Sequence, residues 1–81
     1  MRCRVLLFAR AQDLAGARSV TLELPEGTTV ADLRRQLAEA QPALAALLER
    51  SALAVNGEFA EADMTIPPAA EVALLPPVSG G

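Results

Sequence analysis

The sequence predicts an α+β fold, in which a sheet packs on one main helix. Short apolar runs of strand length recur along the chain, but only one long helical pattern occurs, before Pro42. Strands and helices do not alternate regularly, which argues against a parallel α/β fold. The chain has 81 residues, 52% of them hydrophobic, and no internal repeat. This size and composition fit one domain with a single small core.

Two strands are expected first. Residues 2–9 contain the continuous apolar run Val5–Phe8, which is typical of a buried strand. Residues 10–16 are expected to form a loop, with room for a helical turn. Residues 19–24 alternate in polarity and place three apolar side chains on one face: Val20, Leu22 and Leu24. The Pro-Glu-Gly sequence at 25–27 ends this second strand.

The main helix is expected to begin after Thr29, a suitable N-cap, with Asp32 adding negative charge to its first turn. Arg34 and Arg35 fall on the polar face, where they are expected to be solvated or to meet an acidic partner. Pro42 either ends this helix or begins a second short one. The apolar side chains of the main helix recur on one face, at Val30, Leu33 and Leu37. In the possible second helix, Leu44, Leu47 and Leu48 cluster.

The C-terminal half is expected to contain a strand at 53–55, followed by a type I′ turn at Asn56-Gly57. Residues 58–64 are weakly patterned and fit a short strand or a loop. Pro67-Pro68 marks an irregular connection. Together with the last strand, these elements give the order strand, strand, helix, strand, short strand, strand.

The last strand is expected over 71–75 and is followed by Pro76-Pro77, which cannot donate to a sheet ladder. We therefore expect a domain at 1–75 and a flexible C-terminal tail at 76–81. If Val72 and Leu74 face the core, the side chains on the opposite face of the strand are those of Ala73 and Leu75.

The composition excludes several classes of function. The chain has no His, one Cys and a net charge of −3, and all seven of its cationic side chains are Arg. A zinc site of the usual kind, an internal disulfide and a Schiff-base lysine are therefore excluded. The negative charge and the two aromatic residues argue against nucleic-acid binding. No apolar run approaches the ~20 residues that span a bilayer, and no signal peptide is recognised, so we expect a cytoplasmic protein.

The C-terminal tail is the strongest candidate for chemistry. Residues 72–81 carry no ionisable side chain, so the terminal carboxylate is the only charge in this segment. Residues 76–81 could extend roughly 20 Å from the sheet, and Gly80 and Gly81 make the tip narrow. Such a tail suits insertion into a partner's active site, where the carboxylate could be activated as an acyl adenylate. The alternative is an inert, frayed terminus.

Four segments resemble the MoaD/ThiS-like ubiquitin-fold family, and in particular the small, sulfur-carrying subunit of molybdopterin synthase. They occur in the family's order along the whole chain: VLLFAR at 5–10, LPEGTTV at 24–30, VNGE at 55–58 and EVALLPPVSGG at 71–81. The resemblance implies a ubiquitin-like β-grasp fold, with a mixed sheet wrapped around one helix and an extended tail. Residues 66–70 depart from the family, which usually has an acidic, glycine-containing turn there.

The resemblance also implies a reaction cycle. An E1-like adenylating enzyme would use ATP to activate the Gly81 carboxylate, and an upstream sulfur donor would convert it to a thiocarboxylate. The tail would then enter the large catalytic subunit and deliver sulfur to a cyclic pyranopterin phosphate, forming the molybdopterin dithiolene. The implied assembly has two small and two large subunits. The chain itself would bind no metal or cofactor and would contribute no catalytic side chain. The inserted residues would be Pro76, Pro77, Val78, Ser79 and Gly80.

Three side chains outside the tail are candidates for a role. Leu75 is a candidate apolar anchor for the partner. Phe59 is a candidate for the same surface, although core packing is the default expectation. Cys3 is expected to be a small buried hydrophobe rather than a sulfur relay.

Three other functions remain open from the sequence. They are a sulfur carrier of thiamin synthesis, a protein modifier that attaches to target lysines through Gly81, and a β-grasp interaction module with an inert tail. The thiamin carriers are usually shorter and place their Asn-Gly turn near the start, whereas here it lies at Asn56-Gly57.

Overall fold

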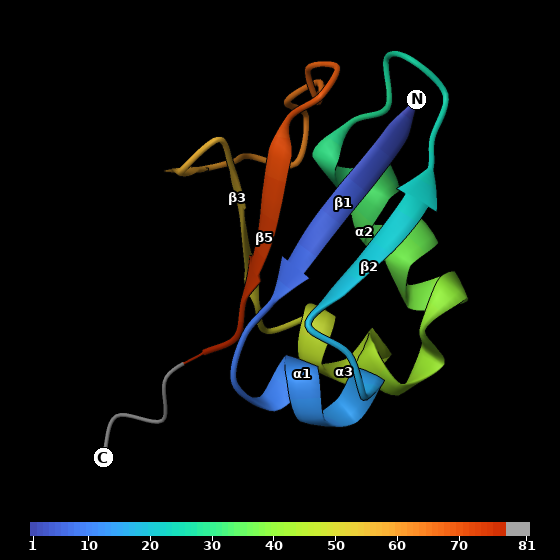
Figure 1. Ribbon diagram of the computed structural model, residues 1–81. Coiled ribbons are helices and arrows are strands. Elements are labelled where there is room, and N and C mark those ends of the chain that lie inside the picture. Colours follow the sequence, from blue (N-terminus) through green and yellow to red (C-terminus); the bar gives the residue numbers. More distant parts are fainter. Residues whose placement is uncertain (78–81) are drawn as a thin grey trace.

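The computed structural model describes residues 1–77. A five-stranded sheet is covered on one face by the main helix α2, with the shorter helices gathered at one end (Figure 1). The helical elements are α1 (Arg10–Ala15), α2 (Val30–Ala40), the 3-10 turn η1 (Pro42–Leu44) and α3 (Ala45–Leu48). The strands are β1 (Arg2–Leu7), β2 (Ser19–Glu23), β3 (Ala52–Val55), β4 (Glu58–Phe59) and β5 (Glu71–Leu75). No helix within residues 1–77 has the length and hydropathy needed to cross a membrane.

The sheet is mixed, and its strand order is β2-β1-β5-β3-β4. β1 pairs with β2 antiparallel and with β5 parallel, and β5 pairs with β3 antiparallel. The parallel pair places Val5 beside Val72 and Leu7 beside Leu74, and all four side chains are almost fully buried. The first and last strands therefore form the centre of the sheet. This arrangement confirms the α+β, β-grasp prediction.

Helix α2 begins and packs as the sequence predicts. Thr29 is extended (φ −87°), and its Oγ1 accepts a hydrogen bond from the Asp32 backbone N–H at 3.2 Å. One face of the helix is buried against the sheet, through Val30, Leu33 and Leu37. The second short helix predicted after Pro42 is also present, as η1 and α3, and it buries Leu44, Leu47 and Leu48.

The expectation that Arg34 is solvated was wrong. Its guanidinium is half-buried and donates hydrogen bonds to the backbone carbonyls of Leu48 and Ser51, the latter at 3.0 Å. The connection from α3 to β3 covers this part of α2, and helical periodicity alone does not reveal such a neighbour. Arg35 is exposed as expected and forms an ion pair with Asp32 at 2.9 Å.

The segment expected to be a loop with a helical turn forms the short helix α1. Ala11 is its buried residue, and Gly16 ends it with a positive φ of 67°. The Gln12 side chain donates to the Leu7 carbonyl at 2.8 Å and so joins this helix to the end of β1. Ala9, which precedes the helix, has φ 51° and ψ −124°, a conformation that favours glycine.

The turn predicted at Asn56-Gly57 is present, with positive φ values of 51° and 84° at the two residues. The Asn56 side-chain oxygen also accepts a hydrogen bond from the Glu71 backbone N–H at 3.0 Å. Strand β4 follows this turn and has only two residues. The weakly patterned stretch after the turn is therefore mostly irregular.

The connection before β5 contains a turn closed by a hydrogen bond from the Ala70 N–H to the Pro67 carbonyl, at 3.2 Å. Ala69, its third residue, has φ 60°. Proline at the second position and a positive φ at the third are typical of a type II turn, where glycine is preferred. Thus the chain forms this turn with alanine in a conformation that suits glycine.

Candidate functional site

Strand β5 leads directly into the predicted tail. Val72 and Leu74 are fully buried, while Ala73 and Leu75 are half-buried on the opposite face, as the alternation predicts. Pro76 is half-buried and Pro77 is exposed. The predicted tail residues Val78, Ser79 and Gly80, and the predicted reactive residue Gly81, lie outside the residues that the structure describes.

The base of the tail is held by neighbours on both sides. β5 is the middle strand of the sheet, hydrogen-bonded to β1 on one side and to β3 on the other. Its last residue, Leu75, lies opposite Ala52 in the β3–β5 ladder. Because a central strand opens less readily than an edge strand, the point from which residues 76 and 77 leave the domain is fixed.

An apolar depression of about 500 Å³ surrounds this point on the outer face of the sheet. Its largest hydrophobic side chains are Phe8, which is 43% exposed, Phe59, which is 78% exposed, and Leu75, and Arg50 lies at its border. Pro76 and Pro77 also line it. Two of the three large exposed hydrophobic side chains in the described chain therefore lie beside the start of the tail. Clustered exposed hydrophobic side chains are typical of a protein-binding surface.

The default expectation of core packing for Phe59 was wrong. Phe59 lies on the short edge strand β4, opposite Ala54 of β3, and its ring is on the outer face of the sheet. The alternative, that Phe59 joins the surface of Leu75, agrees with the structure because both residues line the depression.

Phe8 is a surface residue that sequence reasoning missed. In the sequence it belongs to the continuous apolar run of the first strand. The period of two could have identified it, because Val5 and Leu7 are buried whereas Leu6 is half-buried and Phe8 is exposed.

Cys3 is the only cysteine of the chain and is 3% exposed, on the core face of β1. Burial raises the pKa of its thiol above the usual range, because the thiolate would be poorly solvated there. This environment confirms the expectation of a small buried hydrophobe. Within residues 1–77, no group of three or more His, Cys, Asp or Glu side chains is arranged to hold a metal ion.

Comparison with known proteins connects this geometry to a family. The model of the ThiS family matches residues 5–81. The molybdopterin synthase sulfur carrier subunit of Chlamydomonas reinhardtii is 35% identical, and the alignment covers 100% of both chains. The protein of the same name from Dictyostelium discoideum is 38% identical, over 96% of this chain and 94% of that one.

Solved structures show the same fold. SAMP1 from Haloferax volcanii superimposes with a TM-score of 0.88 at 31% identity, over 100% of both chains. A crystal structure of small archaeal modifier protein 1 from the same organism gives a TM-score of 0.85 at 30% identity. The match covers 95% of this chain and 98% of that one. The putative molybdopterin converting factor subunit 1 of Pyrococcus furiosus gives a TM-score of 0.83 at 27% identity, covering 96% of this chain and 99% of that one.

Proposed function

The chain belongs to the ThiS family, and we propose that it is the sulfur carrier subunit of a molybdopterin synthase. Its full-length similarity to proteins of that name supports this assignment over thiamin synthesis. The observation that carries it is the position of the tail. The tail leaves the middle strand of the sheet, beside the exposed side chains of Phe8, Phe59 and Leu75. The domain thus offers a surface that a partner could bind and a tail without charged side chains that could reach a separate active site.

The proposed reactive group is the carboxylate of Gly81. One carboxylate oxygen attacks the α-phosphorus of ATP on an E1-like enzyme, and pyrophosphate leaves. Sulfide supplied by a donor then attacks the carbonyl carbon of the acyl adenylate, AMP leaves, and a thiocarboxylate remains. ATP is a substrate of the activating enzyme, and the carrier itself holds no cofactor. Because both bond changes occur at the main-chain terminus, the carrier needs no His or Lys, and the sequence has neither.

The last residues suit delivery into a narrow site. Pro76 and Pro77 restrict the base of the tail, and Gly80 and Gly81 present no Cβ beside the reacting carbonyl. Taking the terminal charge out of water is costly, so the receiving site is expected to supply cationic groups. In that site the thiocarboxylate sulfur attacks a carbon of a cyclic pyranopterin phosphate. Water then cleaves the acyl–sulfur bond, so the sulfur stays on the pterin and the carboxylate is regenerated. Two such deliveries complete the dithiolene.

We further propose that the receiving partner is the large catalytic subunit, in a cytoplasmic assembly of two small and two large subunits. The apolar depression would bind this subunit and the tail would enter its active site. Burying aromatic and aliphatic side chains at such a contact supplies most of the binding free energy. The catalytic side chains would then belong to the large subunit.

A second candidate function is attachment to target proteins. The Haloferax volcanii structures carry the name of a small archaeal modifier protein and are 30–31% identical to this chain. In this alternative a lysine amine attacks the same acyl adenylate, AMP leaves, and an amide bond joins Gly81 to the target. Both functions use the same activation, so they differ only in the acceptor.

Reconstitution separates the two candidates. The thiocarboxylated chain and the large subunit of the same organism are mixed with cyclic pyranopterin phosphate, and molybdopterin is measured. The sulfur-carrier proposal predicts product with the intact chain and none with a chain that lacks Gly81. Lysine-linked adducts in cell extract, together with normal pterin levels in a deletion strain, would instead support the modifier.

A further inference from the structure

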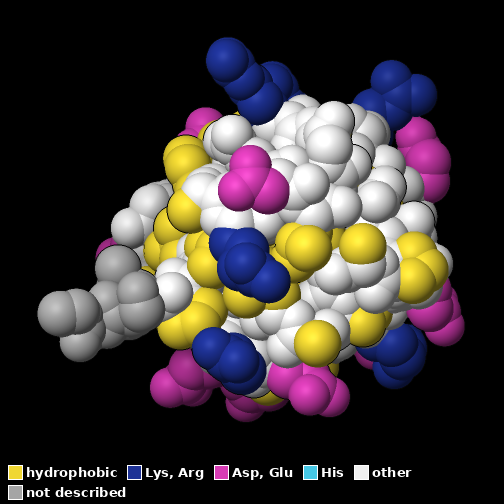
Figure 2. Space-filling model, turned by 90° about the horizontal axis from the view of Figure 1, so that it is seen from below, with side chains coloured by type: hydrophobic (Ala, Val, Ile, Leu, Met, Phe, Trp, Pro, Cys, Tyr) yellow, Lys and Arg dark blue, Asp and Glu magenta, His cyan; other side chains and the backbone are white. Residues whose placement is uncertain are grey.

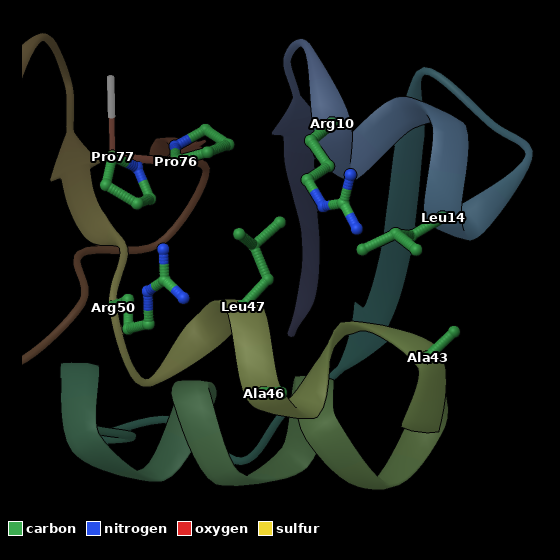
Figure 3. Close-up of a pocket in the computed structure, with 8 residues that line it drawn as sticks. All are labelled: Arg10, Leu14, Ala43, Ala46, Leu47, Arg50, Pro76 and Pro77. Atoms are coloured by element: carbon green, nitrogen blue, oxygen red, sulfur yellow. The ribbon is translucent and has the colours of Figure 1, made fainter. Parts of the chain in front are cut away.

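A second hollow, of about 650 Å³, lies at the end of the molecule formed by α1, η1 and α3. Arg10 comes from the start of α1, Arg50 follows α3, and Pro76 and Pro77 belong to the base of the tail. In Figure 3, Leu47 projects into the space between the two guanidiniums, and Leu14 lies near Arg10. We call this hollow the arginine groove.

Within the part of the chain that the structure describes, the arginine groove holds two cations without acidic partners. Among residues 1–77, the ion pairs use Arg2 and Arg35, and neither Arg10 nor Arg50 has a carboxylate within 4.0 Å. None of the described residues that line the groove is Asp or Glu, although the whole chain carries a net charge of −3. Arg10 also stands in the first turn of α1, where a positive charge is unfavourable to the helix dipole. Neither an ion pair nor the helix dipole therefore stabilises the positive charge of Arg10 at this position.

The floor of the groove is apolar. Leu14 is 37% exposed there, although it is a large hydrophobic side chain. Figure 2, which views this end of the molecule from below, shows dark blue cationic side chains beside yellow hydrophobic ones, with magenta acidic side chains around them. A free phosphate would use the cations but not this apolar floor. A polypeptide segment with carboxylates on either side of an apolar side chain would use both.

The groove is also continuous with the apolar depression beside the tail. Arg50, Pro76 and Pro77 line both hollows. A partner that binds Phe59 and Leu75 while it receives the tail would therefore also contact Arg50. If its interface extended further along the groove, it would contact Arg10. This inference rests on the proposed function, because it takes the partner to be the protein that receives the tail.

We propose that the arginine groove docks an acidic segment of the large subunit, in which carboxylates pair with Arg10 and Arg50 while an apolar side chain packs on Leu14. Arginine suits this role because its planar guanidinium can bind a carboxylate through two parallel hydrogen bonds. The pairs would increase the rate of association and fix how the domain is oriented when the tail enters.

The test measures the affinity of the large subunit for four chains by calorimetry at low and at high NaCl. The chains are the unsubstituted one, Arg10→Glu/Arg50→Glu, Arg10→Gln/Arg50→Gln and the control Arg18→Glu. Arg18 is exposed and lies outside both hollows. We expect the double reversal to weaken binding by about tenfold or more at low salt. The Gln pair should have a smaller effect, the control should bind nearly normally, and high salt should reduce the differences.

A second measurement identifies the docked segment. A photoreactive residue placed at Ala46, which is exposed and lines the groove, is cross-linked to the large subunit and the captured peptide is sequenced. The inference predicts a peptide with Asp or Glu around an apolar residue. Unchanged affinity of the double reversal, or a captured peptide without acidic residues, overturns the inference and leaves the proposed function intact. Failure of the unsubstituted chain to bind the large subunit overturns both.

Discussion

Phe59 and Leu75 line one apolar depression, although Phe59 lies on the edge strand β4 and Leu75 on the central strand β5. Strand β3 lies between them in the sheet, pairing Ala54 with Phe59 and Ala52 with Leu75. The small alanine side chains of β3 leave open space between the larger ones on the outer face. This relationship places an exposed apolar surface where the tail begins.

Leu75→Arg is expected to weaken binding to the large subunit by tenfold or more, since a charge would be buried against an apolar surface. Phe59→Ala should have a similar effect, because aromatic side chains dominate binding at many interfaces. Phe59 is 78% exposed in the isolated chain, so its loss should change the free energy of unfolding by less than about 0.5 kcal/mol.

The control for these variants is Thr21→Arg, on the exposed face of the edge strand β2. This substitution adds the same charge at a distance from the depression, so the variant should bind the large subunit with normal affinity. Titration calorimetry measures the affinity, and urea unfolding measures the stability. Normal affinity of Leu75→Arg would remove the depression from the interface.

Arg34→Ala is expected to destabilise the domain by about 1–3 kcal/mol, because the carbonyls of Leu48 and Ser51 would lose a charged donor. For a domain of this size, each kcal/mol corresponds to a fall in Tm of roughly 4–8 °C. Arg35→Ala makes the same substitution one residue later in the helix and removes only an exposed ion pair, so it should cost less than about 1 kcal/mol. Equal thermal shifts in the two variants would contradict this assignment.

Ala69→Gly is expected to stabilise the domain by about 0.5–1 kcal/mol. Ala69 has φ 60°, where the Cβ of an L-residue comes too close to the backbone and raises the energy. Glycine has no Cβ and adopts this conformation without strain. Ala62→Gly is the control, since Ala62 is exposed in a turn without a positive φ and should lose stability through chain entropy. Urea unfolding distinguishes the two. A loss of stability in Ala69→Gly would show that the positive φ of Ala69 does not destabilise the folded domain.

Cys3 should react slowly with iodoacetamide in the folded chain, and readily after unfolding, because burial raises the pKa of its thiol. The same shift predicts a dependence of stability on pH. The protonated thiol of Cys3 makes its full contribution to the unfolding free energy below the pKa of the unfolded thiol, about 8.5. This contribution is lost as the pH rises through the higher pKa of the folded state. The unfolding free energy should therefore fall above that pH. Cys3→Val should lack this component, and an identical pH profile in the variant would contradict the assignment.

Much of the fold could be predicted because its signals are local. The N-cap at Thr29, the spacing of Val30, Leu33 and Leu37, and the Asn56-Gly57 turn each depend on residues close together in the sequence. The alternation in β5 likewise placed Leu75 on the outer face. The central pairing of β1 with β5 was not predicted, because pairing between distant strands leaves no local pattern.

The candidate site was predictable only in part, for the same reason. The terminal Gly-Gly and the Pro-Pro before it can be read directly from the sequence. The exposure of Phe8 and Phe59 and the role of Arg34 depend on which element packs beside each residue. The arginine groove joins residues of α1, the end of α3 and the tail base, so no sequence pattern could bring Arg10 and Arg50 together.

The most direct test of the proposal is the intact mass of the chain after incubation with its activating enzyme, ATP and a sulfur source. Two chains are compared, the natural one and one extended by a single residue beyond Gly81, with thermal unfolding used to verify that both are folded. We expect one oxygen-to-sulfur exchange in the natural chain, none in the extended chain and the same Tm for both. An unchanged mass of the natural chain with an enzyme shown to be active, or dithiolene formation by the extended chain, would contradict a reactive group at the Gly81 carboxylate.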